Sequence, residues 1–281
     1  MNSTVKIFGV RMSLIGDCVM ALPILDYLKE KHKDSYVYFS LAQKCKQALF
    51  LFKDDPRIDE VKITDNYESL GEEDMKIADS CDIFINPKPQ HPKEFDWYNY
   101  RSCVEETFIM AGLDLKDLKT KPALFLGKPL QKHKKTISIW PVAGYGKGLN
   151  RSPSKEWWEG LLSRFEGIDV YQFGASDDFI LNLPNVKRFN NMSFEDQIIN
   201  SLKCSVILGT DSGSMWVTGA YGLIPQINLI TNWQINHNSN FLALAPEGEK
   251  CVNIFANGSC NNIDQDIVAE KITNILYHEK L

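Results

Sequence analysis

The sequence predicts an α/β protein built from two doubly wound parallel-sheet domains that face a central cleft. Short apolar runs alternate with amphipathic helical patterns along the chain, which is typical of parallel strands joined by crossover helices. The alternation restarts after a lysine-rich segment over 116–135 that holds two prolines and little periodicity. A length of 281 residues accommodates two domains of ordinary size. We therefore expect one domain over 1–135 and a second over 136–281.

In the first half, apolar and β-branched runs predict strands. These strands are expected over 5–10, 36–41, 58–63 and 81–85. A helix is expected from Asp17 to about Lys31, with Pro23 near its start, where a proline is tolerated or marks the true first turn. A further helix over 105–111 is expected to end at Gly112.

The second half repeats the pattern. Strands are expected over 137–140, 170–173, 205–209 and 226–230, and helices over 157–165, 195–202, 216–221 and 267–276. Trp157 and Trp158 begin the first of these helical stripes, so we expect them to pack a helix against the sheet.

The composition excludes several classes of protein. With 31 basic and 36 acidic residues, the net charge of −5 is too acidic for binding nucleic acid by bulk electrostatics. The seven cysteines are scattered, without Cys-x-x-Cys or zinc spacing, and are expected to be buried thiols of a reducing cytosol. From the apolar pattern we expect neither a secretion signal nor a membrane-spanning stretch. We expect a cytoplasmic protein, with at most a reversible, peripheral contact with the cytoplasmic membrane.

The first candidate site lies between the first strand and the first helix, at Arg11, Ser13, Gly16 and Asp17. Asp17 would be either the N-cap of the helix or a general base projecting into the cleft. A helix N-terminus favours the ionised carboxylate, whereas burial would raise its pKa. The sequence alone leaves both interpretations open.

The second candidate is the turn Thr210-Asp211-Ser212-Gly213, which follows an apolar strand and opens a helix. Small residues at such a turn allow backbone N–H groups to approach a phosphate, which the helix dipole also favours. The alternative is an ordinary turn capped by Thr210 or Asp211.

The third candidate is the loop after the strand over 137–140, which carries Gly144, Lys147 and Arg151. Its spacing is not that of a Walker A loop. It would be either a flexible surface loop or a loop that brings cations over a diphosphate.

One metal-like pattern has a simpler explanation. Asp264 and Asp266 form an Asp-x-Asp pair directly before the last amphipathic helix, so helix capping is expected there. We expect no metal site in the chain.

Taken together, the order of these turns resembles glycosyltransferase family 9, the lipopolysaccharide heptosyltransferase family. That family opens with Arg-x-Ser-x-x-Gly-Asp and a helix containing a proline, and later has an Asp-Ser/Thr-Gly-x-x-His turn and a Gly-x-Pro strand entry. The matching segments here are 11–17 with Pro23, then 211–216 and 222–225. In the middle, 141–144 is similar to the family's loop, Arg151 stands where its phosphate-binding lysine does, and 191–195 resembles the segment before its donor turn.

The resemblance implies a GT-B fold of two Rossmann-like domains, the first binding an acceptor and the second a nucleotide-diphosphate sugar. It implies an inverting, metal-independent transfer of a heptose-like sugar from an ADP-heptose-like donor to a glycan or lipopolysaccharide-type acceptor, without a separate cofactor and with Asp17 as the base. The donor-binding residues would be Gly144, Lys147, Arg151, Met192, Asp211, Ser212, Gly213 and Trp216. The acceptor-binding residues would be Arg11, Ser13 and Gly16.

Two departures from the family pattern leave alternatives open. Trp216 stands in place of the family's histidine, and Arg151 replaces its lysine while keeping the cation and adding a fork for phosphate. A catalytically silent nucleotide-sugar-binding protein is one alternative. A sugar-nucleotide epimerase or hydrolase of GT-B type is another, and it would need an acid/base pair of which the sequence suggests only Asp17.

Overall fold

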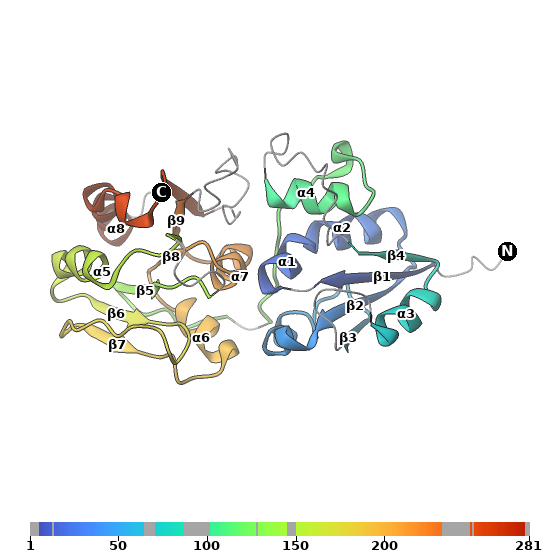
Figure 1. Cartoon of the computed structure of the whole chain (residues 1–281), viewed down its shortest axis with the longest axis horizontal. Helices are drawn as coiled ribbons and strands as arrows, with labels where there is room; N and C mark the ends of the chain where they lie inside the picture. The colour runs from blue at the N-terminus through green and yellow to red at the C-terminus, as the bar shows by residue number, and fades with distance from the viewer. Residues whose placement is uncertain are drawn as a thin grey trace. The chain divides into compact units, whose positions relative to one another are not determined.

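The chain divides into two compact units, Met1–Phe125 and Leu126–Leu281, each built on its own parallel sheet (Figure 1). The computed structural model describes residues 6–12, 14–64, 71–86, 102–127, 129–144, 150–231, 248 and 250–278. The division falls inside the lysine-rich segment over 116–135. The predicted fold class, α/β with two parallel sheets, is confirmed, and the cleft between the units stays a prediction.

Unit 1 holds a four-stranded parallel sheet in the order β3-β2-β1-β4. The central strand β1 pairs on both sides, so that Val10 lies opposite Phe39 on β2 and Ile85 on β4. Helices α1, α2 and α4 lie on one side of the sheet and α3 on the other (Figure 1). The elements are β1 (Ile7–Met12), α1 (Ile15–Met20), α2 (Leu22–Lys31), β2 (Tyr36–Ala42), η1 (Gln43–Leu51), β3 (Glu60–Thr64), α3 (Glu72–Asp79), β4 (Ile83–Ile85), α4 (Cys103–Met110) and η2 (Leu115–Asp117).

Unit 2 holds a six-stranded parallel sheet in the order β10-β9-β8-β5-β6-β7. Right-handed crossovers place α5 on one face and α6 and α7 on the other, and α5 packs on α8 while α6 packs on α7. The elements are β5 (Thr136–Trp140), α5 (Lys155–Leu162), η3 (Ser163–Phe165), β6 (Asp169–Gln172), β7 (Val186–Arg188), α6 (Phe194–Ser201), β8 (Val206–Thr210), α7 (Gly213–Tyr221), β9 (Gln226–Thr231), β10 (Cys251–Ala256), η5 (Cys260–Asn262) and α8 (Gln265–His278).

The tryptophan pair of α5 lies in the core of unit 2, as predicted. Trp158 is completely buried among apolar residues of β5, β6, β8, β9 and α8. Trp157 packs edge-on against it with ring centroids 5.3 Å apart, and its indole N–H donates to the Ile263 carbonyl at 3.0 Å. Truncating a buried ring of this size costs about 3–5 kcal/mol, so this contact between helix and sheet is a main stabiliser of unit 2.

The predicted helix from Asp17 to Lys31 is two helices, which is a correction to the sequence analysis. The chain breaks at Ala21, between α1 and α2, and Pro23 lies in the first turn of α2. A proline deeper in a helix would remove a backbone donor and clash with the preceding turn, whereas the first turn lacks partners for its donors in any case. Pro23 therefore marks the true start of the second helix.

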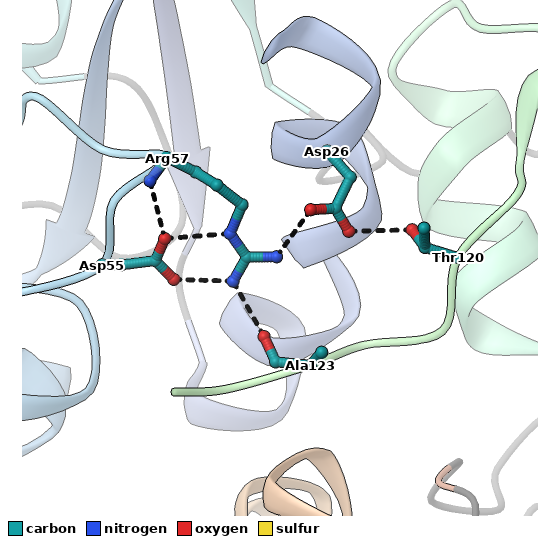
Figure 2. A network of polar contacts seen from close by, with 5 residues as sticks. All are labelled: Asp26, Asp55, Arg57, Thr120 and Ala123. Carbon is teal, nitrogen blue, oxygen red and sulfur yellow. Dashed lines mark hydrogen bonds and ion pairs between the residues drawn. The ribbon is translucent and has the colours of Figure 1, made fainter. Parts of the chain in front are cut away.

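The buried side chain of Arg57 ties the last segment of unit 1 to α2 (Figure 2). Its guanidinium forms a two-bond fork with Asp55, with Nη2–Oδ2 at 2.6 Å and Nε–Oδ1 at 2.9 Å. Nη1 donates to Asp26 at 2.9 Å, and Nη2 also donates to the carbonyl oxygen of Ala123 at 2.8 Å. The other oxygen of Asp26 accepts from the Thr120 hydroxyl at 2.8 Å. Three donor nitrogens of Arg57 are thus matched to acceptors within unit 1.

Two expectations from composition can be compared with the structure. All seven cysteines are free thiols, and Cys18, Cys45, Cys204 and Cys260 are buried as expected, whereas the other three are half-buried. In the described part of the chain, every helix is too short or too polar to cross a bilayer.

The strand orders place a reversal of chain direction in each sheet. In unit 1 the chain leaves β1 toward β2 and later returns to β4 on the opposite side of β1; in unit 2 it leaves β5 toward β6 and later returns to β8 on the opposite side of β5. Open α/β sheets bind ligands beyond the carboxyl ends of strands at such reversals. The segments that follow β1, β5 and β8 are therefore the places to look for a site.

Candidate functional site

In unit 1, the segment after β1 places Asp17 in the first turn of α1. The helix begins at Ile15, and its N-cap residue is Leu14, which has no side chain able to accept a hydrogen bond. The interpretation of Asp17 as the N-cap is therefore wrong. Its partly buried carboxylate lies where the helix dipole stabilises a negative charge.

Of the three predicted acceptor-binding residues, the structure describes Gly16 fully and Arg11 only in its backbone. Gly16 lies in α1 and is half-buried, and Arg11 lies in β1 with its side chain outside the described part. Ser13 is outside the described residues. Their proposed role stays a prediction.

A second carboxyl, which the sequence analysis missed, lies near Asp17. Glu106 is on α4, which packs against α1, and is only 4% exposed. Its Oε1 atom has no hydrogen-bond partner among the described residues. Burial, and then the charge of Asp17, raise the pKa of Glu106 to about 8. No pattern in the sequence indicates this, because the segment of α4 is typical of an ordinary apolar helix with two adjacent acids.

In unit 2, the turn after β8 is joined to the loop after β5 by a buried ion pair. Arg151 Nη2 donates to Asp211 Oδ2 at 2.6 Å and to the Asp211 carbonyl oxygen at 3.0 Å. Both residues are 9% exposed. Burial raises the pKa of the Asp211 carboxyl, and the guanidinium of Arg151 opposes that rise. Two predicted donor-binding residues, 60 positions apart, are thus in direct contact.

The turn after β8 is not the ordinary turn capped by Thr210 or Asp211 that was the alternative to an anion site. The N-cap of α7 is Ser212, and its side chain makes no capping hydrogen bond. Thr210 ends β8 and Asp211 pairs with Arg151, so the interpretation of either as the cap is wrong.

Trp216, on α7, lies beside the Asp211 carboxyl of this ion pair. Its side chain is 2% exposed, and a hydrogen-bond interaction with it lowers the pKa of the Asp211 carboxyl. The residue that stands where the family resemblance predicts a histidine is thus a tryptophan that interacts with the Asp211 carboxyl.

Two hydroxyl groups beside the pair have unused hydrogen-bonding capacity. Thr210 Oγ1 and Ser212 Oγ are buried and lack hydrogen-bond partners within the part of the chain that the structure describes. Leaving a buried hydroxyl unbonded costs about 1–3 kcal/mol. The first backbone N–H groups of α7 emerge at the same turn, as they do wherever a helix begins. This arrangement suits a ligand with several acceptor oxygens.

The turn is held in place by close packing and by a polar network behind it. A Cβ atom at Gly209 would stand 2.9 Å from the Trp140 carbonyl oxygen and 2.5 Å from Met215 Sδ, so this position needs glycine. Gln226 on β9 donates to the Met215 carbonyl oxygen at 2.8 Å and accepts from Thr218 at 2.6 Å, which fixes α7 to the sheet. The sequence signal that could have indicated this network is a pair of amide side chains, Gln226 and Asn228, in an otherwise apolar strand.

The remaining predicted positions are more dispersed. Gly144 is exposed at the end of the segment after β5, and Lys147 lies outside the described residues. Met192 is exposed before α6, and Gly213 is the first residue of α7. Asp264 accepts from the Asp266 N–H at 2.8 Å, which confirms the predicted helix cap. Among the described residues, no group of three or more His, Cys, Asp or Glu side chains gathers at one point.

Comparison with known proteins gives matches in structure alone. No family model matches the sequence, and no curated protein matches it either. The structure of the E. coli ADP-heptose lipopolysaccharide heptosyltransferase II matches with a TM-score of 0.75 and 16% identity, covering 99% of this chain and 100% of that one. A family 9 glycosyl transferase from Veillonella parvula matches with a TM-score of 0.72 and 16% identity, covering 100% and 99%.

A third structure, the E. coli heptosyltransferase WaaC with ADP, matches with a TM-score of 0.67 and 11% identity, over 96% of this chain and 100% of that one. Matches at these identities show the fold, and they bear out the structural side of the resemblance seen in the sequence. The chain has the GT-B-like fold of these heptosyltransferases, with one parallel sheet in each of its two units.

Proposed function

We propose that this protein is an inverting, metal-independent glycosyltransferase that moves a heptose-like sugar from an ADP-heptose-like donor to a glycan or lipopolysaccharide-type acceptor. The observation that carries this proposal is the position of reactive groups at both sheet reversals of the fold. Asp17 follows β1 in unit 1, and the Arg151–Asp211 pair follows β5 and β8 in unit 2. Each group lies where an open α/β sheet binds its ligand.

The donor diphosphate would bind at the turn after β8. Arg151 supplies a positive charge, and the hydroxyls of Thr210 and Ser212 with the first N–H groups of α7 supply donors. Fixed donors of this kind stabilise the charge of a leaving nucleoside diphosphate. ADP is the favoured nucleotide because structures of the same fold have been solved with ADP and with ADP-2-deoxy-2-fluoro heptose. Gly144, Lys147, Met192 and Trp216 would complete the donor site.

Asp17 would act as the base in a single displacement. Its carboxylate takes the proton from an acceptor hydroxyl, and the freed electron pair of that oxygen forms a bond to the anomeric carbon. The bond from the anomeric carbon to the diphosphate oxygen breaks, and the nucleoside diphosphate leaves with its electron pair. Attack opposite to the leaving group inverts the anomeric configuration, through a transition state with oxocarbenium character.

The acceptor would bind to unit 1, where Arg11, Ser13 and Gly16 flank Asp17 in the sequence. A lipopolysaccharide-type acceptor would place the protein in the cytoplasm, in peripheral contact with the membrane that carries this acceptor. No nucleic acid is expected among its partners.

The test is product analysis with ADP-heptose and a panel of acceptors. We expect an inverted glycoside and free ADP, formed at the same rate in the presence of EDTA. Asp17→Asn should lower turnover by roughly 10²–10⁴ while leaving donor affinity nearly unchanged. Near-normal turnover of this variant would refute the role of Asp17, and a rate restored only by Mg²⁺ or Mn²⁺ would refute metal independence.

A catalytically silent nucleotide-sugar-binding protein is a second candidate. The buried side chain of Trp216 on α7 favours this candidate, because an indole cannot exchange protons with a sugar as a histidine could. ADP binding without any product would identify this case. An epimerase or hydrolase is less well supported, since the second carboxyl, Glu106, is buried at 4% exposure rather than open to a substrate.

A further inference from the structure

We propose that Asp17 and Glu106 form a coupled carboxyl pair that holds one proton at neutral pH, with Glu106 acting as a positioning residue that fixes the charge of Asp17. This inference rests on the proposed role of Asp17 as the base. It extends that role, because it explains how a buried corner of unit 1 can keep a single usable negative charge.

The geometry places both carboxyls at one corner of unit 1. Asp17 is in the first turn of α1 and Glu106 is in the first turn of α4, and the two helices pack against each other. Glu106 is 4% exposed, and the described residues offer its Oε1 atom no donor. A buried carboxylate without a donor or a cation is strongly disfavoured, whereas the protonated acid is not.

Among the residues that the structure describes, no group supplies the missing positive charge to the Glu106 carboxyl. The titratable or charged residues on the elements packed against α4 are Asp17 and Cys18 on α1, Asp26, Tyr27, Lys29, Glu30 and Lys31 on α2, and Lys116 and Asp117 on η2; α4 itself adds Cys103 and Glu105. Within the described chain, Asp17 is the group whose charge acts on the Glu106 carboxyl. Its negative charge favours the proton on Glu106, and a neutral Glu106 adds no second negative charge beside Asp17.

The consequence for the proposed reaction is a simple proton count. The pair carries one proton, on Glu106, before the transfer, and two after Asp17 has taken the proton of the acceptor hydroxyl. If Glu106 were ionised instead, a second negative charge beside Asp17 would favour the protonated form of Asp17 and remove the base. Two interacting carboxyls of this kind titrate in two steps that belong to the pair.

The direct test is infrared spectroscopy of the full chain as a function of pH. We expect a protonated carboxylic acid band at pH 7 that disappears with a midpoint near pH 8. The band should be absent from Glu106→Gln and retained in Glu105→Gln, a matched control one position away on α4. In Asp17→Asn the midpoint should fall but stay above 4.5, because burial is the larger cause of the shift.

Stability gives a second readout that requires no activity. Since folding raises the pKa of Glu106 from 4.5 to about 8, the folded form loses stability as pH rises between these values. Relative to Glu106→Gln, the folded-to-unfolded ratio of the wild type should therefore fall by up to about tenfold per pH unit in that range. Chemical denaturation at a series of pH values measures it, and equal pH profiles of the two proteins would overturn the proposal.

The outcomes separate this proposal from the proposed function. No acid band at pH 7, or a midpoint unchanged in Asp17→Asn, overturns the coupled pair even if the protein proves to be a transferase. The expected band in a protein that transfers no sugar supports the pair and removes the proposed function. For an active enzyme, we expect an inflection near pH 8 in the turnover of the wild type and Glu105→Gln that is missing in Glu106→Gln.

Discussion

Each unit contains a buried arginine that meets an aspartate at 2.6 Å, and the two pairs differ in what surrounds them. Arg57 in unit 1 reaches Asp55, Asp26 and the Ala123 carbonyl oxygen, so its donors end on acceptors of the unit itself. Arg151 in unit 2 reaches Asp211 at a sheet reversal, next to two buried hydroxyls that lack partners in the described chain. The Arg57–Asp55 pair therefore stabilises the fold of unit 1, and the Arg151–Asp211 pair is part of a candidate site.

This difference shows that the ion pair alone indicates nothing about function. A buried pair is weak proof of a stabilising role, because desolvation offsets much of the Coulomb attraction. Two other features indicate a binding site: buried hydrogen-bonding groups that lack a partner among the described residues, and a position at which this type of fold binds ligands. Both are found at Arg151, whereas each guanidinium nitrogen of Arg57 donates to an acceptor of unit 1, and these bonds hold the end of unit 1 on α2.

The largest expected effect is on stability, at Arg57. Arg57→Ala leaves Asp55 and part of Asp26 without their cation, and breaking a buried pair in this way costs about 3–5 kcal/mol. Chemical denaturation measures the loss. Lys119→Ala, which removes an exposed ion pair with Glu30 in the same unit, is the control and should change stability very little. Equal losses in the two variants would contradict the structural role of Arg57.

The next effect concerns which nucleotide the site in unit 2 accepts. A ligand at 100 times its dissociation constant stabilises a folded protein by about 2.7 kcal/mol, which raises the melting temperature by several degrees for a chain of this size. We expect this shift with ADP in a melting series that includes UDP, GDP and CDP at matched concentration. A shift with UDP or GDP and none with ADP would reject the ADP-sugar donor but leave the fold unaffected.

The smallest expected effect distinguishes binding from stability at the two hydroxyls. Ser212→Ala and Thr210→Val should each weaken nucleotide binding by about 0.5–1.5 kcal/mol, the usual contribution of one hydrogen bond. Neither should lower stability, because each removes a buried group that has no partner within the described residues. Denaturation and nucleotide titration of the same samples measure both. Lost stability with unchanged nucleotide affinity would assign these hydroxyls to the fold instead.

Sequence reasoning succeeded where the information is local. Strand and helix patterns follow from residues a few positions apart, and so does the cap at Asp264. For Pro23 the sequence left two helix boundaries open, since a proline is either tolerated near the start of a helix or marks its first turn. The packing of Trp157 and Trp158 follows from their helical spacing.

What the sequence could not show depends on contacts between distant segments. Arg151 and Asp211 are 60 positions apart, and their pairing requires the loops after β5 and β8 to meet at one sheet edge. The burial of Glu106 depends on the packing of α4 against α1, which no local sequence pattern predicts. The capping interpretations of Asp17 and Asp211 failed for a related reason: a helix can begin without a side-chain cap when tertiary packing holds it.

The measurement that tests the central claim most directly is calorimetric titration of ADP into the wild type, Arg151→Ala and Arg164→Ala. Arg164 is the matched control, an arginine of unit 2 whose ion pair with Asp266 is exposed. We expect Arg151→Ala to weaken ADP binding by about 1.5–3 kcal/mol, the range for hydrogen bonds to charged groups, and Arg164→Ala to leave ADP binding unchanged. Circular dichroism of each variant checks that it is folded. Unchanged ADP affinity in folded Arg151→Ala would contradict the claim that the turn after β8 is the donor site.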